Sequence, residues 1–304
     1  MADQPLVFDR DFDPRHGEAV ALTPLVRRVV CANPGPFTFH GTNTFLVGRD
    51  ELAVIDPGPD DPVHVEAILR AAGAAPITAI LATHTHRDHS PAAVALKAAT
   101  GATVYGEGPH RPARALALGE INPLDASGDH DFRPDVVLGH GDRVSGADWT
   151  LEAVGTPGHT ANHLCFALMQ ERSLFTGDHV MGWSTSIVAP PDGLMADYMA
   201  SLQLLLERAE THYHPAHGAS IVDGHGFVRG LVRHREGRAA AALTALSAGP
   251  ATIAEMVATI YADTPKSLHG AAALSLFAQV EDLVARGLVT CDGVPALGSV
   301  YRRA

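Results

Sequence analysis

Short apolar runs separated by polar turns fill the first two thirds of the chain. Residues 43–56 consist of an apolar run, a polar turn at 49–51 and a second apolar run that ends at Asp56. Residues 162–178 repeat this order and end at Asp178. Both patterns predict β-hairpins. Two hairpins that each end on an aspartate indicate two related halves that face each other.

Apolar residues at helical spacing predict three long helices, at residues 62–72, 195–208 and 226–248. The stripe of Met and Leu along the second of these is typical of core packing rather than of a cofactor contact. Residues 77–83 form a further apolar run, which predicts a buried strand. Residues 108–135 are rich in Gly, Pro, Asp and Arg, so we expect a long surface excursion there with no readable function.

The pattern changes in the last quarter of the chain. Helical segments at 253–257 and 267–286 are followed by a short strand at 288–290. Helix, turn, helix and a small hairpin are the order of a winged helix. We therefore expect a first domain at residues 1–227 and a small winged-helix domain at residues 228–304, which includes the connecting helix.

The composition of this C-terminal segment argues against DNA recognition. From residue 251 on, four basic residues stand against five acidic ones, and residues 267–286 are mostly Ala and Leu. A helix that reads a DNA groove needs basic and amide side chains on its face. We expect no sequence-specific DNA binding, and we expect the segment to pack against the first domain.

Side chains that bind metal ions are concentrated directly after the predicted strand at 77–83. Four of the six positions that follow Thr83 carry imidazole or carboxylate groups: His84, His86, Asp88 and His89. Such groups bind borderline-soft divalent ions. Next in the chain, Ser90 suits the N-cap and Pro91 the first position of a helix. The turn is therefore expected to lie between a strand and a helix.

Three later turns offer further ligands. His159 lies in Thr-Pro-Gly-His-Thr, Asp178 in Thr-Gly-Asp-His and His217 in His-Pro-Ala-His-Gly. Each of these alone is more typical of an ordinary loop residue. Zinc prefers about four ligands, and the first turn cannot supply them all and leave room for a nucleophile. Together the four turns predict a metal site that is assembled from several loops.

These motifs resemble those of the metallo-β-lactamase fold superfamily. Its pattern of H-x-H-x-D-H, a T-P-G-H-T-like turn, G-D and a final His before Gly occurs here in order. The resemblance implies an α+β fold, a four-layer αββα sandwich, and two bound metal ions, with zinc expected and iron or manganese as alternatives. It assigns the ligands as follows: His84, His86 and His159 for one ion, Asp88, His89 and His217 for the other, and Asp178 as the bridge.

The same resemblance implies a dinuclear zinc hydrolase in which a hydroxide shared by the two ions attacks the substrate. Asp56 matches a family aspartate near the metals and is expected to orient a ligating histidine. His179 is a candidate proton donor to the leaving group, although a purely structural contact is equally consistent with its position. Pro91-Ala92 and Ala216 depart from the usual family glycines, but neither departure removes a ligand.

A narrower branch of the superfamily is indicated by residues 33–48, by Arg87 within the first motif and by residues 197–202. These resemble proteins similar to the mitochondrial β-lactamase-like endoribonuclease, which implies cleavage of single-stranded RNA. Hydrolysis of a small ester or thioester, as in glyoxalase II, stays open as an alternative, as does opening of a lactone or lactam. Zinc-dependent lactamases generally lack a bridging aspartate, so Asp178 argues against antibiotic hydrolysis.

RNA binding would need cations and aromatic faces beside the site. Residues 37–39, Phe-Thr-Phe, offer aromatic rings, and the predicted helix at 226–248 offers a basic track: Arg229, Arg233, Arg235 and Arg238. Core packing and a solvated helix face are equally consistent with these patterns. A winged-helix regulator is the non-enzymatic alternative, but it predicts a basic recognition helix and an incomplete ligand set, and the sequence has neither.

Composition sets the remaining limits. The 304 residues are 46% hydrophobic, enough for real cores, and the formal charge of −12 gives no general attraction to polyanions. We find no segment of signal-peptide character and no apolar run of membrane length, so we expect a cytoplasmic protein without a membrane partner. Cys31, Cys165 and Cys291 lie outside every motif and are expected to be buried small hydrophobes. The oligomeric state stays open.

Overall fold

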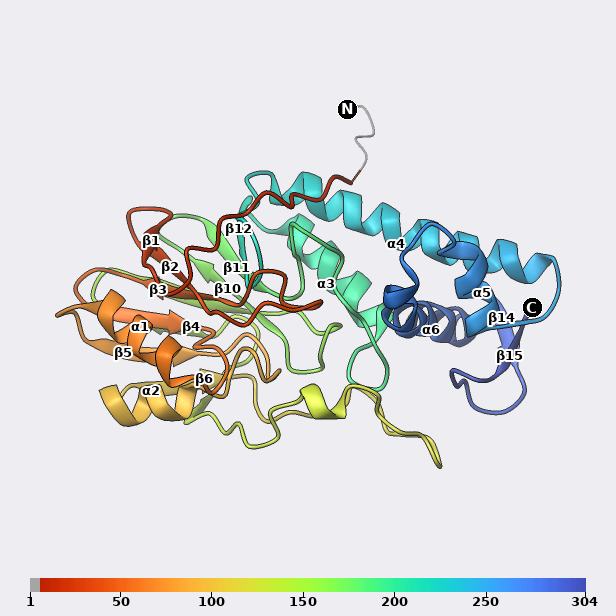
Figure 1. Ribbon diagram of the computed structural model, residues 1–304, viewed down its shortest axis with the longest axis horizontal. Coiled ribbons are helices and arrows are strands. Elements are labelled where there is room, and N and C mark those ends of the chain that lie inside the picture. The colour runs from red at the N-terminus through yellow and green to blue at the C-terminus, as the bar shows by residue number, and fades with distance from the viewer. Residues whose placement is uncertain (1–5) are drawn as a thin grey trace.

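The computed structural model of the protein describes residues 6–304, in which three β-sheets and six α-helices are formed (Figure 1). The helices are α1 (Pro62–Ala72), α2 (Ala93–Thr100), α3 (Met195–Glu207), α4 (Gly224–Ser247), α5 (Ile253–Ile260) and α6 (His269–Ala285), with short 3-10 turns η1 (Asp125–Ser127) and η2 (Lys266–Leu268). The strands are β1 (Val20–Ala21), β2 (Val26–Val30), β3 (Asn43–Val47), β4 (Leu52–Ile55), β5 (Ile77–Leu81), β6 (Thr103–Gly106), β7 (Val136–Val137), β8 (Arg143–Ser145), β9 (Thr150–Gly155), β10 (Leu164–Leu168), β11 (Ser173–Gly177), β12 (His212–Pro215), β13 (Ala251–Thr252), β14 (Val289–Cys291) and β15 (Val300–Arg303).

Two of the sheets repeat one plan. The first has the order β1-β2-β3-β4-β5-β6-β7, and the second has the order β12-β11-β10-β9-β8. In the first sheet the β3–β4 hairpin is extended by β5, which is parallel to β4. In the second, the β10–β11 hairpin is extended by β12, which is parallel to β11. Both predicted hairpins are confirmed, and each leads into a parallel strand.

Alternating side chains on these strands build three layers of core. In β10, Leu164, Phe166 and Leu168 pack between the two sheets, while Cys165 and Ala167 pack on the opposite face, against α3 and α4. The first sheet does the same, because alternate residues face the second sheet or face α1 and α2. Figure 1 shows these two pairs of helices on opposite sides of the sheets. The predicted four-layer αββα sandwich is confirmed.

Helix α4 connects the sandwich to the C-terminal module, by which we mean residues 251–304. Near its start Val228 and Leu231 pack in the sandwich core, and near its end Leu246 packs in the core of the module. Within the module α5 and α6 pack on a small sheet of order β13-β15-β14, as expected for a winged helix. The predicted boundary between residues 227 and 228 falls in the first turn of α4.

Packing also explains how the module is placed. Ala278 of α6 lies in the same buried cluster as residues of α3 and α4, so the module contacts the sandwich directly. No helix of residues 6–304 combines the length and the apolar character needed to cross a membrane. The predicted burial of the cysteines is correct for Cys31 and Cys165, whereas Cys291 is partly exposed on β14.

One local prediction is wrong. Helix α2 begins at Ala93, and Ala92 rather than Ser90 is its N-cap. The Ser90 hydroxyl donates instead to a carboxylate oxygen of Asp129, 2.6 Å away. A carboxylate partner competes well for this short hydroxyl side chain, because hydrogen bonds to charged acceptors are the stronger ones. The predicted excursion at residues 108–135 is present, with η1 as its one regular turn among the described residues.

Candidate metal centre

The turn that follows β5 carries the first group of candidate ligands. Its backbone is fixed by hydrogen bonds from His89 N to His86 O and from Gly58 N to His89 O, of 3.0 and 2.9 Å. Three of its side chains are almost fully buried, with exposed fractions of 1% for His84, 8% for His86 and 0% for His89. The turn lies at the C-terminal end of β5, an interior strand of the first sheet, and its side chains meet those of His159, Asp178 and His217 from the second half.

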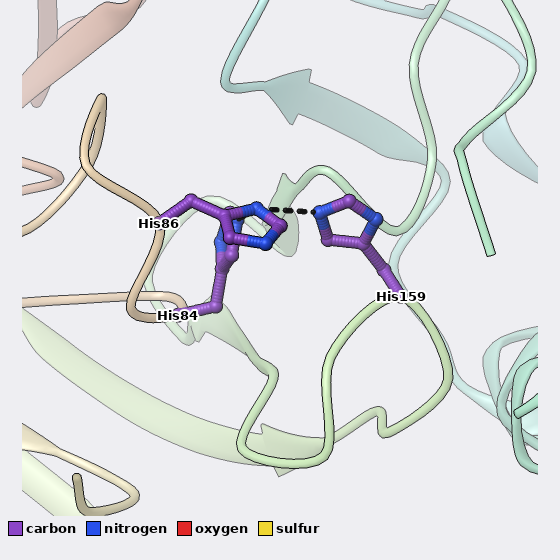
Figure 2. Close-up of side chains that lie close together, drawn as sticks. All are labelled: His84, His86 and His159. Carbon is purple, nitrogen blue, oxygen red and sulfur yellow. Dashed lines mark hydrogen bonds between the residues drawn. The ribbon is translucent and has the colours of Figure 1, made fainter. Parts of the chain in front are cut away.

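Three imidazole nitrogens converge there. His84 Nε2 and His159 Nε2 lie 2.9 and 3.0 Å from His86 Nδ1. Figure 2 shows His84 and His86 entering from one turn and His159 from the facing loop, with the rings directed at one another. Burial, with His159 adding to it, lowers the pKa of His86 to about 3, so this ring is neutral. Neutral rings with converging nitrogens present lone pairs to a shared cation.

The outer nitrogens decide which atom faces inward. His159 Nδ1 donates to the backbone oxygen of Ile187 at 2.6 Å, and His84 Nδ1 contacts Thr83 Oγ1 at 3.1 Å. A ring that donates from Nδ1 keeps the lone pair of Nε2 free, and metal-ligating histidines are commonly fixed in this way. The tautomers of both rings therefore suit metal binding.

A second group consists of Asp88, His89 and His217. An oxygen of Asp88 lies 3.2 Å from His89 Nε2 and 3.3 Å from His217 Nε2. His217 Nδ1 donates to the backbone oxygen of Gly41 at 3.1 Å, so Nε2 is the nitrogen that faces the group. The structure brings these three side chains from two distant turns within reach of one ion.

Asp178 lies between the two groups. Its Oδ1 is 3.2 Å from His217 Nε2, and its Oδ2 is 3.7 Å from His159 Nε2. One carboxylate oxygen thus faces each group, which is the arrangement that a bridging ligand requires. Burial acts to raise the pKa of Asp178, but His217 and His89 outweigh it and hold that pKa well below its usual range.

The charge and hydrogen bonding of the cluster fit divalent cations. His89 Nε2, His217 Nε2 and Asp178 Oδ1 are buried and have no hydrogen-bond partner, although buried polar atoms normally have one. Burial acts to lower the pKa of His217, but Asp178 and Asp88 raise it to about 10. The negative charge of Asp88 and Asp178 therefore stabilises positive charge between the two groups of ligands. Bound metal ions can provide this positive charge in place of protons.

Asp56 stands behind the second group rather than inside it. It accepts hydrogen bonds from the backbone N–H and the hydroxyl of Thr83, at 2.7 and 2.8 Å, and from His89 Nδ1 at 3.0 Å. This is the contact that the predicted orienting role needs. It keeps Nε2 of His89 facing Asp88 and Asp178.

His179 is not brought to the site. Its side chain is fully buried, neither ring nitrogen has a hydrogen-bond partner, and the ring packs 4.7 Å from the ring of Tyr198. Burial lowers its pKa to about 3, so the ring is neutral. His179 does not line the pocket described below. Its predicted role as proton donor has no contact to support it, and the structural alternative fits the geometry.

His163 has a role that the sequence did not reveal. Its Nε2 accepts the backbone N–H of Asp178 at 3.3 Å, and its Nδ1 contacts Thr156 Oγ1 at 2.8 Å. The ring therefore supports the backbone of the candidate bridging residue. Its position four residues after His159, at the start of a predicted strand, was the available signal, but a histidine in that place is more typical of packing.

A pocket of about 320 Å³ adjoins the two groups. Its lining combines candidate ligands with apolar side chains: His86, Asp88, His159 and Asp178, together with Phe37, Leu124, Met181 and Ile187. Arg87 is the one lysine or arginine among the described residues that line it. Phe37 of the predicted aromatic loop lines the pocket, whereas Phe39 stacks on Trp183 with ring centres 4.7 Å apart.

The predicted basic track on α4 is wrong for two of its four arginines. Arg235 is 4% exposed, donates to the backbone oxygen of Ser186 and lies over the Tyr198 ring. Arg238 lies over the Tyr261 ring and donates to the backbone oxygen of Ile260. Carbonyl oxygens and aromatic faces thus occupy both guanidinium groups, which leaves them poorly placed for phosphates.

Comparisons with known proteins agree with this geometry. The family model described as the metallo-beta-lactamase superfamily matches residues 37–220, and the beta-lactamase associated winged helix domain matches residues 252–294. The lactamase-like protein adaB of Aspergillus niger is 30% identical over 278 residues, which is 85% of this chain and 80% of that protein. A protein of Cryptosporiopsis named atrochrysone carboxyl ACP thioesterase dmxR1 is 30% identical over 260 residues, 80% of this chain and 74% of that protein. The crystal structure of a beta-lactamase domain protein from Burkholderia ambifaria has the same fold, with a TM-score of 0.79 at 22% identity, covering 97% of this chain and 96% of that one.

Proposed function

The chain belongs to the metallo-β-lactamase superfamily, whose members are hydrolytic enzymes, and on that premise we propose that it hydrolyses thioesters with the help of two divalent metal ions. The observation that carries the proposal is the pocket of about 320 Å³, which is lined both by candidate ligands and by apolar side chains. Apolar walls suit the hydrocarbon part of an acyl group, while the ligands mark where the carbonyl would react.

Two zinc ions held by the seven candidate ligands, with iron or manganese as alternatives, would supply a hydroxide at neutral pH and polarise the carbonyl oxygen. The protein's own contribution is to place the ligands. Asp178 faces both groups, and Asp56 holds the ring of His89 with its lone pair inward. Because the outer nitrogens of four of the five candidate rings, those of His84, His89, His159 and His217, contact a fixed oxygen atom, most of the site is organised before the substrate arrives.

The leaving group also favours a thioester. A thiol has a pKa of about 8.5, so a thiolate leaves without a proton donor, whereas the alkoxide of a phosphodiester needs one far more. His179, the sequence-based candidate for such a donor, lies outside the pocket. The relative from Cryptosporiopsis is named a thioesterase, and from that name we extend only the type of bond to this chain.

RNA cleavage stays a prediction from the sequence. A single strand needs a track of cations beside the site, and two of the four arginines proposed for it are bound to carbonyl oxygens and rings. The net charge of −12 adds no general attraction. These observations make RNA the weaker proposal, and a test of substrates should include it, together with a lactone and a β-lactam.

The test is a substrate panel on purified protein reloaded with zinc, iron or manganese after chelation. We expect kcat/KM for an acyl N-acetylcysteamine thioester to exceed that for single-stranded RNA, a lactone or a β-lactam by about 100-fold, which is about 2.7 kcal/mol. Elemental analysis should find two metal ions per chain. Activity should vanish on chelation and return on reloading.

Two results would contradict the proposal. Metal-dependent cleavage of RNA without turnover of any thioester would show that the protein acts as an endoribonuclease. Full activity with one metal ion per chain would remove the dinuclear assignment. Asp60→Asn, a change in an exposed loop residue, serves as the control that should leave metal content and turnover unaltered.

A further inference from the structure

One wall of the pocket comes from residues 111–128, which we call the wall segment. Leu124, Ala126 and Ser127 of this segment line the pocket. Its end is attached to the metal-binding turn, because Arg87 N donates to Ser127 O at 2.9 Å and Gly128 forms a β-bridge with His86. The position of the wall segment therefore sets how much space lies beside the candidate ligands.

Apolar burial does little to hold the middle of this segment. Leu118 and Ile121 are strongly exposed, at 107% and 85%, and Leu116 is 45% exposed. η1 is the only regular structure that residues 111–128 contain. A segment of this length without a core of its own needs polar anchors to keep one position. Figure 1 shows it, in yellow, reaching beyond the sheets towards the C-terminal module.

The polar anchor is an ion-pair cluster that joins the wall segment to the module. Arg114 Nη1 and Nη2 donate to the two carboxylate oxygens of Glu120, each at 2.7 Å. Arg114 Nε donates to Glu281 of α6 at 2.9 Å, and Nη2 lies 2.8 Å from the same oxygen. The three side chains are only 23%, 16% and 17% exposed. Partly buried charge-assisted bonds of this kind are stronger than surface ion pairs.

The cluster links the wall segment to the module, while Ala113 N and Arg114 N donate to Pro191 O, at 2.8 and 3.4 Å, and so tie the start of the segment to the sandwich domain. Two hollows, of about 500 and 370 Å³, are lined by residues of both the wall segment and the module. Arg114 and Glu281 both line the larger one, so their ion pair lies beside open space. A second contact, from Asn122 Nδ2 to Asp192 at 2.8 Å, ties the segment to the loop that carries Ile187 of the pocket.

We propose that Arg114 and Glu281 are positioning residues through which the C-terminal module sets the size of acyl group that the pocket accepts. The ion pair holds the wall segment, and the wall segment holds Leu124 and Ala126 beside the reacting carbonyl. The proposal rests on thioester hydrolysis as the function. It gives the module a part in substrate choice in place of DNA binding.

The experiment compares acetyl and decanoyl N-acetylcysteamine thioesters, which share a leaving group and differ in acyl length. In Glu281→Gln and in Arg114→Gln we expect KM for the decanoyl thioester to change by about 5- to 20-fold, which is of the order of one hydrogen bond. We expect kcat, metal content and KM for the acetyl thioester to change by less than about twofold. Hydrogen exchange of peptides that cover residues 117–128 should become faster.

Three comparisons make the result specific. Asp282→Asn removes the same charge one position further along α6, where Asp282 pairs with Arg286 of its own helix, and it should leave the selectivity for acyl length unaltered. Arg114→Lys keeps the charge and should restore part of the selectivity. The double variant Arg114→Gln with Glu281→Gln should be no worse than Arg114→Gln alone, because the two residues act through one contact.

The outcomes separate this inference from the proposed function. If the wild type hydrolyses no thioester, the proposed function fails. If the wild type is active but the variants keep its acyl selectivity and its exchange rates, the positioning role fails. An equal loss for both thioesters, or a loss of metal, would show a general structural defect and would overturn the proposal as well.

Discussion

The two sheets bring the chain to the candidate metal centre along the same path, but the aspartates at the ends of their hairpins have different contacts there. In the first half the β3–β4 hairpin ends at Asp56, and the parallel strand β5 leads into the His-rich turn. In the second half the β10–β11 hairpin ends before Asp178, and the parallel strand β12 leads to His217. Each half thus has an aspartate at the end of its hairpin and a histidine-bearing turn after its parallel strand, while Asp88 and His159 are further candidate ligands from the first and the second half.

The two aspartates meet the histidine rings from opposite sides. Asp56 accepts from His89 Nδ1, the nitrogen that faces away from the cluster. Asp178 lies beside the inward Nε2 atoms of His217 and His159. Equivalent places in the fold therefore give one residue that orients a ligand and one that can itself be a ligand. The side of the ring that a carboxylate reaches decides its role, and experiments on the pair can test this.

The largest effect is expected from Asp178→Asn. The amide keeps the shape but loses the charge that faces both groups, so both metal sites should weaken and activity should fall by about 1,000-fold or more. The measurement is turnover together with elemental analysis. Chelated wild type is the matched comparison, because it should melt at the same temperature as the variant if loss of metal is the whole cause. If Asp178→Asn retained two tightly bound ions, Asp178 would not be a ligand, and its role would not differ from that of Asp56.

Gly177→Ala should have the next largest effect. Gly177 has φ of +50°, and a Cβ there would lie 2.6 Å from His163 Nε2 and 2.8 Å from Thr83 Oγ1. We expect a loss of about 2–4 kcal/mol in the free energy of unfolding, from backbone strain and overpacking together. Chemical denaturation measures it.

Gly73→Ala is the control for that change. Gly73 also has a positive φ, of +65°, but a Cβ there would meet no described atom within 4 Å. Gly73→Ala should therefore cost only about 1–2 kcal/mol, from the backbone alone. Equal losses at the two positions would show that the close approach of the two halves at Gly177 has no energetic weight.

The features that both halves share could be predicted from the sequence. Both hairpins were visible as paired apolar runs, and every candidate ligand was visible because it follows a strand in a turn rich in Pro, Gly or His. The four layers were implied by the family resemblance, which the two hairpins supported. Hairpins and turns are determined mainly by nearby residues, so the local sequence is enough to predict them.

The remaining features depend on contacts between distant segments. The residues next to Asp56 and Asp178 do not themselves tell which carboxylate meets the inner nitrogen of a ring, and only the family resemblance distinguished the two roles. The wall segment is joined to α6 by the ion pair of Arg114 and Glu281, which lie 167 residues apart in the chain. The spacing of the α4 arginines, by contrast, does predict that they differ. Arg229 and Arg233 are four positions apart and share one helix face, whereas Arg235 lies on another face.

Asp56→Asn should give an intermediate effect. One end of the asparagine would present N–H groups to His89 Nδ1, so the ring would have to move its proton to Nε2 and lose the inward lone pair. Loss of such a supporting carboxylate typically weakens metal binding by about 10- to 100-fold. Competition with a chromophoric chelator measures the affinity of each ion. Asp60→Asn removes an equal charge from the same loop and should have no effect; a loss as large as that of Asp178→Asn would mean that both aspartates are ligands.

The smallest effect concerns the hydroxyl groups that support the two aspartates. Thr83 donates its hydroxyl to the carboxylate of Asp56 at 2.8 Å, whereas Ser186 donates to the backbone oxygen of Asp178 at 2.5 Å. Thr83→Val removes the hydroxyl that contacts both Asp56 and His84 Nδ1, so we expect about 3- to 10-fold weaker binding of each ion, equivalent to about one hydrogen bond at each site. Ser186→Ala does not touch the Asp178 carboxylate and should change metal affinity by less than about twofold. The same chelator competition compares the two variants. If Ser186→Ala weakened the metal more than Thr83→Val, the backbone position of Asp178 would matter more than the orientation of His89, and the two halves would differ in how they are supported as well as in what they supply.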